Sequence, residues 1–224
     1  MRLVLALSAA MLAAPVAEAA TTDFTLDFSG DICTTTAGGP MNQTCGNGSR
    51  ISQDYGDIAG KLDVIHDANR TAAGLQDLFY WGTGYASLDN VAYGTNGGGG
   101  LSILFQPEAG HFVTVTGFQI AHYNTNRVAN TTVEVIDMAG GSSLFRQAYN
   151  PLPKNEVFSF SGSWTSTSGI RINLGPDAWD VGISNITGSV SVIPLPAAGW
   201  LLLSALAGLG LAARRRRTAT ATRA

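Results

Sequence analysis

Carboxylates are the side chains whose type and spacing in this sequence come nearest to a chemical site. Asp23 and Asp27 fall on one face of an alternating stretch near the start, and Asp180 lies beside the last predicted strand. Hard oxygen ligands such as these suit Ca²⁺, although none of the groups has the twelve-residue EF-hand spacing. If the protein binds a cation, we expect Asp23 and Asp180 to hold Ca²⁺. The alternative is that these carboxylates are solvated and keep a secreted domain soluble.

Signatures of catalysis by histidine, serine or a phosphate loop do not occur in the sequence. His66, His111 and His122 are scattered and show no HExxH spacing. No Gly-x-Ser-x-Gly motif marks a serine nucleophile, and the glycine run 97–100 lacks the Lys-Ser/Thr of a phosphate-binding loop. We therefore predict a protein that is not an enzyme and that needs no cofactor apart from the Ca²⁺ considered above.

Aromatic residues offer a second type of site, because exposed rings can stack on the apolar faces of sugars. Tyr85 precedes the glycine run and Trp164 lies in a turn-rich segment, so we expect both to be exposed and available for stacking on a glycan. Trp81 and Trp179 are expected to fill the core, where large aromatic side chains supply much of the buried area.

The two cysteines, Cys33 and Cys45, bound a loop rich in Thr, Gly, Asn and Pro with little apolar content of its own. Their spacing is not that of a zinc site, and no histidine lies near them in the sequence. In an oxidising compartment two such cysteines pair. We predict a structural Cys33–Cys45 disulfide.

Alternation of apolar and polar residues with a period of two dominates residues 20–193. In 22–28, for example, Phe24, Leu26 and Phe28 fall on one face. Glycine and proline separate these runs, and no segment has a long amphipathic helical stripe. The pattern predicts an all-β fold, a two-sheet β-sandwich or jelly roll. The later predicted strands are 61–66, 101–105, 112–123, 132–138, 143–149, 157–160, 170–174 and 181–186, and residues 187–193 either finish the last strand or form a stalk.

The first nineteen residues have the organisation of a secretory signal peptide. Arg2 supplies a positive charge, residues 3–14 are an apolar run too short to span a bilayer, and Ala17-Glu18-Ala19 gives a small-x-small cleavage pattern. We predict that residues 1–19 direct export and are removed after Ala19.

An apolar run at 197–213, in which Ser204 is the single polar side chain, predicts one C-terminal transmembrane helix. Seventeen residues at about 1.5 Å each extend roughly 26 Å, near the lower limit for crossing a hydrocarbon core. The run is followed by Arg214, Arg215, Arg216 and Arg217. Four adjacent arginines stop transfer and stay on the cytoplasmic side, which places the preceding domain outside and residues 218–224 in a cytoplasmic tail.

The charge of the predicted exported part differs from that of the whole chain. The chain has a formal net charge of −3, whereas residues 20–193 hold seven Lys and Arg against fifteen Asp and Glu, a net charge of −8. A domain this acidic disfavours nucleic acid and anionic membranes as partners. Cations and neutral glycans remain compatible with it.

The C-terminal part resembles a known sorting signal. The residues that carry the resemblance are Ile193, Pro194, Leu195, Pro196 and Ala197, followed by the apolar helix and the arginines. This order resembles the VPLPA variant of the PEP-CTERM signal, with Ile193 in the valine position and seven extra residues after the arginines. The resemblance implies a sorting signal at 193–217, an exported domain at 20–192, and an exosortase-like membrane protease as a partner that cuts near the proline motif.

Three other interpretations of the tail remain open in principle. A plain single-pass anchor would show the same helix and arginines, with the prolines serving only as helix punctuation. Residues 195–199 resemble the LPxTG sortase motif, but Ala198 stands where that motif has threonine. A glycosylphosphatidylinositol signal does not normally end in a stop-transfer arginine cluster. We favour the sorting signal.

The exported domain resembles, more loosely, jelly-roll domains that often precede such tails. The matching segments are 51–57 and 179–186, and in the second an Asp commonly stands where this chain has Ser184. Together these features predict an exported, non-enzymatic protein. It would be anchored in the inner membrane with its domain outside, then passed to the cell surface or an extracellular polysaccharide matrix. The alternatives are a carbohydrate-binding module and a secreted carbohydrate-active enzyme with paired carboxylates.

Overall fold

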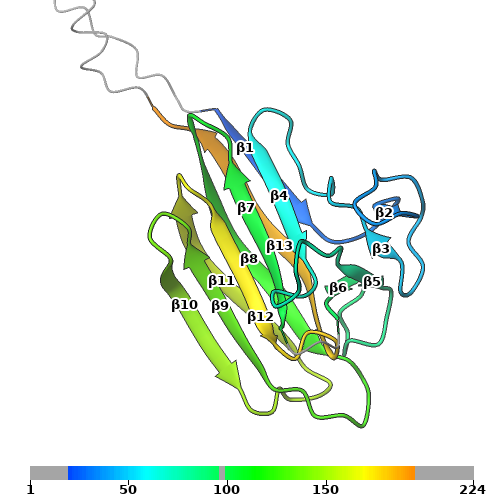
Figure 1. Ribbon diagram of the computed structural model, residues 1–224. Coiled ribbons are helices and arrows are strands. Elements are labelled where there is room, and N and C mark those ends of the chain that lie inside the picture. The colour runs from blue at the N-terminus through cyan, green and yellow to red at the C-terminus, as the bar shows by residue number, and fades with distance from the viewer. Residues whose placement is uncertain (1–19, 96–98, 195–224) are drawn as a thin grey trace, which may run out of the picture. The chain divides into compact units, whose positions relative to one another are not determined.

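Alternating side chains produce strands throughout the computed structural model, which describes residues 20–95 and 99–194 (Figure 1). Every regular element in these ranges is a strand, and the strands form two antiparallel sheets. The prediction of an all-β, two-sheet sandwich is therefore confirmed, while the finer jelly-roll assignment stays a prediction. The larger sheet has the order β11 (Val157–Ser166), β8 (His111–His122), β13 (Val181–Val192), β6 (Val91–Tyr93), β5 (Phe79–Trp81), β3 (Arg50–Ile51) and β2 (Cys33–Thr34), with β1 (Thr21–Leu26) also paired to β13. The smaller sheet has the order β10 (Ser142–Tyr149), β9 (Thr131–Asp137), β12 (Ile170–Pro176), β7 (Leu101–Pro107) and β4 (Leu62–Asp67).

The core lies between the inner faces of the two sheets. Strand β12 shows how the alternation works: Ile170, Ile172 and Leu174 are fully buried, while Arg171 and Asn173 point to the opposite face. Strand β8 contributes Val113 and Val115 from the other side. Residues 20–193 form one compact unit with this core, which is the condition for a domain to fold on its own.

The first and last strands, β1 and β13, are neighbours in the larger sheet. Strand β1 pairs with β13 from Thr21 opposite Ser191 to Leu26 opposite Ile186. Residues 187–192 therefore finish the last strand and do not form a stalk. The Ile193 amide then donates to the Gly110 carbonyl, 2.8 Å away, so backbone pairing continues up to the proline motif.

Several predictions lie outside the described residues. These are the signal peptide at 1–19, the helix at 197–213, the arginine cluster at 214–217, the tail at 218–224 and, within the sorting motif, Leu195, Pro196 and Ala197. Among the residues that the structure describes, no helix is long and apolar enough to cross a membrane.

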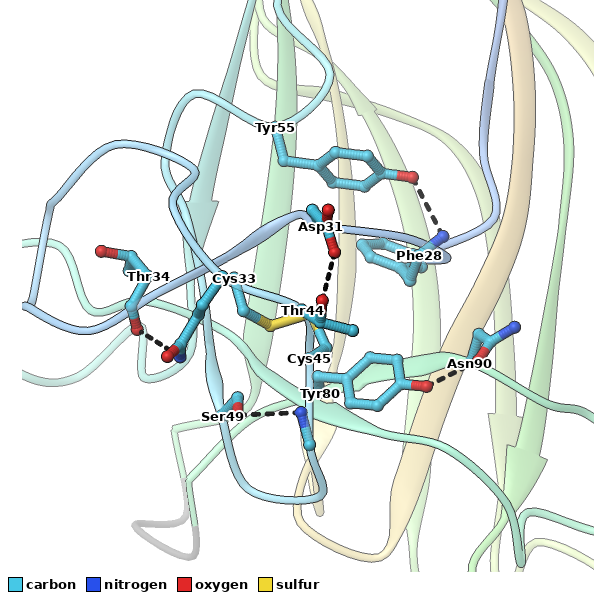
Figure 2. Close-up of a disulfide and its surroundings, with 12 residues drawn as sticks. Phe28, Asp31, Cys33, Thr34, Thr44, Cys45, Ser49, Tyr55, Tyr80 and Asn90 are labelled. Carbon is cyan, nitrogen blue, oxygen red and sulfur yellow. Dashed lines mark hydrogen bonds between the residues drawn. A yellow bond between two sulfur atoms is a disulfide. The ribbon is translucent and has the colours of Figure 1, made fainter.

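The predicted disulfide is present and secures a loop on the outside of the sandwich (Figure 2). Cys33 bonds to Cys45, and the backbone of Cys33 also pairs with Gln43 across the loop. The Thr44 hydroxyl donates to the Asp31 carboxylate beside the bridge. A crosslink that closes a loop of this length stabilises a fold by about 3 kcal/mol. Such a bond is typical of domains outside the reducing cytoplasm.

One titratable side chain lies within the core. His66 of β4 is fully buried, and neither ring nitrogen has a hydrogen-bond partner. The Gln53 side chain accepts a hydrogen bond from the His66 amide and donates one to the His66 carbonyl, at 3.1 Å each. The Tyr55 ring contacts the imidazole edge-on, with 6.3 Å between ring centroids. Burial lowers the pKa of His66 to about 4, with the Asp77 carboxylate opposing that shift. The neutral imidazole is therefore the form that the fold requires.

We predict that this histidine makes the domain less stable in mild acid. Between about pH 6.5 and 4 the unfolded state binds a proton that the folded state excludes, so the free energy of unfolding falls as the pH falls. Chemical denaturation of residues 20–193 should show a loss of about 2 kcal/mol between pH 7 and pH 5. The His66→Leu variant should lose most of this dependence. An equal loss in the variant would show that other groups cause it.

Candidate functional site

A depression of about 490 Å³ lies on the outer face of the larger sheet, beside the loop 82–90. We name it the polar concavity, because amide, hydroxyl and carboxylate side chains make up most of its wall. It is lined by Asp27, Ser87, Leu88, Asp89, Asn90, Gln119, Val157, Ser159 and Asn185. These residues come from the end of β1, the loop 82–90, and the three adjacent strands β8, β11 and β13.

The floor of the polar concavity is a chain of hydrogen bonds across three strands. The Asn185 side-chain amide on β13 donates to the Gln119 carbonyl oxygen on β8 at 2.7 Å. The Gln119 amide in turn donates to the Ser159 hydroxyl on β11 at 2.9 Å. These bonds fix the orientation of all three groups. They leave the Asn185 carbonyl oxygen and the Ser159 hydroxyl proton available to a ligand.

A bulge in β13 aims Asn185 into this row. The register of β13 against β8 shifts between Ser184, opposite Gln119, and Thr187, opposite Gly117, so β13 carries one extra residue there. Asn185 has a φ of 51°, in the left-handed region. Bulges are frequent beside functional sites because they redirect a side chain without breaking the sheet.

Backbone strain is concentrated around the polar concavity. Five non-glycine residues among those described have a left-handed φ, and four of them line it or adjoin a lining residue. They are Phe28, Ala86, Asn90 and Asn185, with φ between 51° and 54°. Each such residue costs on the order of 1 kcal/mol, less for asparagine, and non-glycine residues of this kind gather at ligand-binding positions.

Buried hydrogen bonds hold the strained segments in place. The Ser184 hydroxyl, fully buried on β13, lies 2.9 Å from the Asn90 carbonyl and 3.4 Å from the Asp27 carbonyl. Its single proton therefore ties the loop 82–90 and the end of β1 to the sheet. The Tyr80 hydroxyl donates to the Asn90 side chain at 2.6 Å (Figure 2). This serine donates to carbonyls and offers no carboxylate to a cation.

Asp27 supplies a fixed negative charge at the rim. Its carboxylate accepts from the backbone amide of Ser29 at 3.0 Å and from the Ser29 hydroxyl at 2.9 Å. The Ser29 amide bond is the main reason that the pKa of Asp27 lies below its usual value. Asp27 is therefore an ionised hydrogen-bond acceptor at neutral pH and has no proton to give.

An aromatic pocket lies on the other side of the loop 82–90. Its lining is Trp81, Tyr85, Tyr93, Tyr123 and Trp179, around a space of only about 40 Å³. Tyr93 and Trp179 meet edge to face, with 5.4 Å between ring centroids and an angle of 90°. Trp179 is 39% exposed and is the ring in this pocket most open to solvent.

The predicted pair of stacking residues is wrong. Tyr85 is only 2% exposed, and its hydroxyl donates to the Trp179 carbonyl at 3.0 Å. Trp164 is 9% exposed because it lies on β11, facing inward against Phe118 and Phe145, and not in a turn. The prediction that Trp179 fills the core is also wrong, since its ring projects from the segment before β13. Trp164, which was expected to be exposed, is therefore buried, and Trp179, which was expected to be buried, is exposed.

The two carboxylates predicted as Ca²⁺ ligands are far apart. Asp23 pairs with Ser189 near one end of β13, whereas Asp180 precedes the other end. Nine residues of strand separate these positions, roughly 30 Å at 3.3 Å per residue. Asp180 is 4% exposed and forms an ion pair of 3.6 Å with Arg127, and burial raises the pKa of Asp180. In residues 20–95 and 99–194, no group of three or more His, Cys, Asp or Glu is placed to hold a metal ion.

Comparison with known proteins supports no assignment of a family, a fold or a function. No family model matches the chain, and no curated protein matches its sequence. Among solved structures, the chain is similar to an isomalto-dextranase of Arthrobacter globiformis T6 complexed with panose, with 16% sequence identity and a TM-score of 0.30. The match covers 77% of this chain but 32% of that one, so this chain spans about a third of its length. A TM-score this low supports no conclusion about substrate or activity.

Proposed function

We propose that this protein is an exported, non-catalytic glycan-binding domain that a C-terminal sorting signal delivers to the envelope or an extracellular polysaccharide matrix. The observation that carries the proposal is the row of Asn185, Gln119 and Ser159 across three strands. It presents fixed donors and acceptors on an open sheet surface.

This arrangement suits a sugar because each sugar hydroxyl both donates and accepts. A side-chain carbonyl beside a hydroxyl donor can bond to two neighbouring hydroxyls of one ring. The row is already ordered by its internal hydrogen bonds and by the bulge in β13. Groups ordered in advance lose less conformational freedom when a ligand binds, so more of the interaction energy becomes affinity.

The aromatic pocket extends the proposed surface. Trp179 exposes part of its ring on the far side of the loop 82–90, and Trp81 is partly exposed in the same pocket. Indole rings bury large apolar area when they stack on the flat face of a sugar. A glycan chain crossing the loop would meet hydroxyl-binding groups first and a stacking ring next.

Binding is favoured over hydrolysis by the state of the rim carboxylate. A glycosidase needs a general acid whose pKa is raised so that it holds a proton at neutral pH. The Ser29 amide and hydroxyl instead lower the pKa of Asp27. Asp27, one of the two carboxylates that line the polar concavity together with Asp89, is therefore unsuited to act as that acid, and we propose a binding domain rather than a secreted carbohydrate-active enzyme.

The proposed sorting step is compatible with the way the domain ends. Strand β13 ends at Val192, and the motif begins at Ile193, whose side chain is 40% exposed. A cut within 193–197 by an exosortase-like membrane protease would therefore leave every strand of the sandwich intact. The arginines 214–217 would hold the uncut precursor in the inner membrane with the domain outside.

Affinity gel electrophoresis tests glycan binding by residues 20–193 secreted into an oxidising compartment. We expect at least one of soluble dextran, starch, xylan and mannan to retard the protein. Asn185→Gly should weaken that binding at least tenfold, because glycine keeps the left-handed backbone but removes the amide. Asn155→Gly is the matched control, since Asn155 has a similar φ of 59° outside the polar concavity and should bind like the wild type. Failure of all four polysaccharides, or equal binding by both variants, would contradict the proposal.

Intact mass spectrometry of the mature protein tests the sorting signal. We expect the full-length chain, expressed in its own cells, to yield a species that begins at Ala20 and ends between Ile193 and Ala197. Substituting Pro194 and Pro196 by alanine should prevent this cut without altering the sandwich. A mature protein that keeps the segment 197–217 would show a plain membrane anchor.

A further inference from the structure

The outer face of the smaller sheet carries a cluster of positive charge that the rest of the domain does not neutralise. Four of the seven Lys and Arg between residues 20 and 193 have partners in the structure. Arg50 and Arg127 form ion pairs with Asp77 and Asp180. Lys61 donates to the Thr22 hydroxyl at 2.8 Å, and Lys154 to the Thr125 carbonyl at 2.7 Å.

The other three cations are Arg70, Arg146 and Arg171, and they gather in one place. Within the described part of the chain, none of their guanidinium groups has an ion pair within 4.0 Å or a hydrogen bond. Arg70 and Arg146 line a depression of about 300 Å³ over β9, β10 and β12. Arg171 lies close enough to Arg70 to repel its charge.

The pairing of the strands places an acid and an amide between these arginines. Arg146 on β10 stands opposite Glu134 on β9, and Glu134 stands opposite Asn173 on β12. Arg171 lies two residues from Asn173 on the same face of β12. Three arginines therefore lie around Glu134, and Asp67 is also near enough to Arg70 to act on its charge.

Two polar atoms at this site are buried without a partner. Asn173 is 3% exposed, it lines the depression, and its Oδ1 accepts no hydrogen bond. The Nε of Arg171 is likewise buried and donates none. Buried polar groups are normally satisfied, because each one left without a partner costs about 1–3 kcal/mol. The open acceptor of Asn173 in the depression, with an open donor on Arg171 two residues away on the same strand, points to a ligand that completes the site.

Glycine backbone keeps Arg70 close to the sheet. A Cβ at Gly100 would lie 2.8 Å from Nη2 of Arg70, and one at Gly175 would lie 3.0 Å from it. A side chain at either position would push the guanidinium away from its place against the backbone. Burial and then the like charge of Arg171 lower the pKa of Arg70, and the carboxylates of Glu134 and Asp67 oppose that shift; a bound anion would oppose it further.

We propose that this arginine-lined depression binds the carboxylate of a uronic acid residue in an acidic polysaccharide. Guanidinium groups bind carboxylates through paired hydrogen bonds, and Arg70 with Arg146 supplies two such groups. A uronic acid also carries hydroxyls next to its carboxylate, and these can donate to Asn173 Oδ1 and to Glu134. A bare phosphate or sulfate offers few donors, so it would leave Asn173 Oδ1 and the Glu134 carboxylate without hydrogen-bond donors.

The inference does not depend on the polar concavity, which lies on the other sheet. Glycan binding at the two sites therefore fails or succeeds separately. If both hold, the domain binds a neutral chain with one sheet and an acidic chain with the other.

Isothermal titration of residues 20–193 with oligogalacturonate, dextran sulfate and neutral dextran tests the acidic site. We expect oligogalacturonate binding that Arg70→Gln/Arg146→Gln weakens at least tenfold. The control Lys61→Gln/Lys154→Gln removes the same charge elsewhere and should change the affinity less than twofold. Asn185→Gly should leave oligogalacturonate binding unchanged, which separates this site from the polar concavity. Arg146→Gln alone, on the exposed strand β10, serves if the double variant does not fold.

Three results would overturn the proposal. One is the absence of oligogalacturonate binding by the wild type. Another is equal weakening by the two double variants, which would indicate attraction by net charge alone. The third is tighter binding of dextran sulfate than of oligogalacturonate, lost in Arg70→Gln/Arg146→Gln, which would assign the site to sulfated chains.

Discussion

The pairing of β13 with β8 on one side and β1 on the other is the constraint on which the rest of the structure depends. It joins the two ends of the domain and brings the row Asn185–Gln119–Ser159 onto one surface. The bulge in β13 adds one residue without breaking this pairing, and at this point Ser184 is buried while Asn185 is exposed. Ser184 then ties down the loop 82–90, which separates the polar concavity from the aromatic pocket. Strand β13 thus joins the first strand of the domain to the sheet and also sets the geometry of the candidate site.

Each sheet uses its two faces for different purposes. On β12, Ile170, Ile172 and Leu174 pack into the core. The alternate positions, Arg171 and Asn173, lie on the outer face near the unpaired Arg70 and Arg146. The larger sheet presents amides and hydroxyls at its outer surface, with Asp27 and Asp89 at the edge of the polar concavity. The core residues hold the backbone beneath these surfaces in place, because a shift of a strand would move its inward side chains within a close-packed interior. Stability and the proposed binding sites are therefore built into the same strands.

Much of the fold could be predicted from the sequence, because alternation is a local property. The long strands appear close to their predicted positions, and the Cys33–Cys45 bridge follows from compartment and loop composition. The short strands β2, β3, β5 and β6 were missed, since two or three residues carry no periodic signal. The predicted strand 157–160 stops short, whereas β11 continues to Ser166 through a bulge between Ser161 and Trp164, and Trp164 is buried. The candidate sites depend on which strands are neighbours. Asn185, Gln119 and Ser159 are therefore ordinary exposed polar residues until the strand order is known.

The account rests on the claim that the polar concavity is the surface that meets a neutral glycan. Nuclear magnetic resonance of ¹⁵N-labelled residues 20–193, titrated with oligosaccharides of the polysaccharide that retards the protein, tests it directly. We predict saturable shifts of the side-chain amides of Asn185 and Gln119 and of the Trp179 indole, with the signals of β9, β10 and β12 unchanged. Shifts that leave those three side chains unaffected, or that never saturate, would contradict the account.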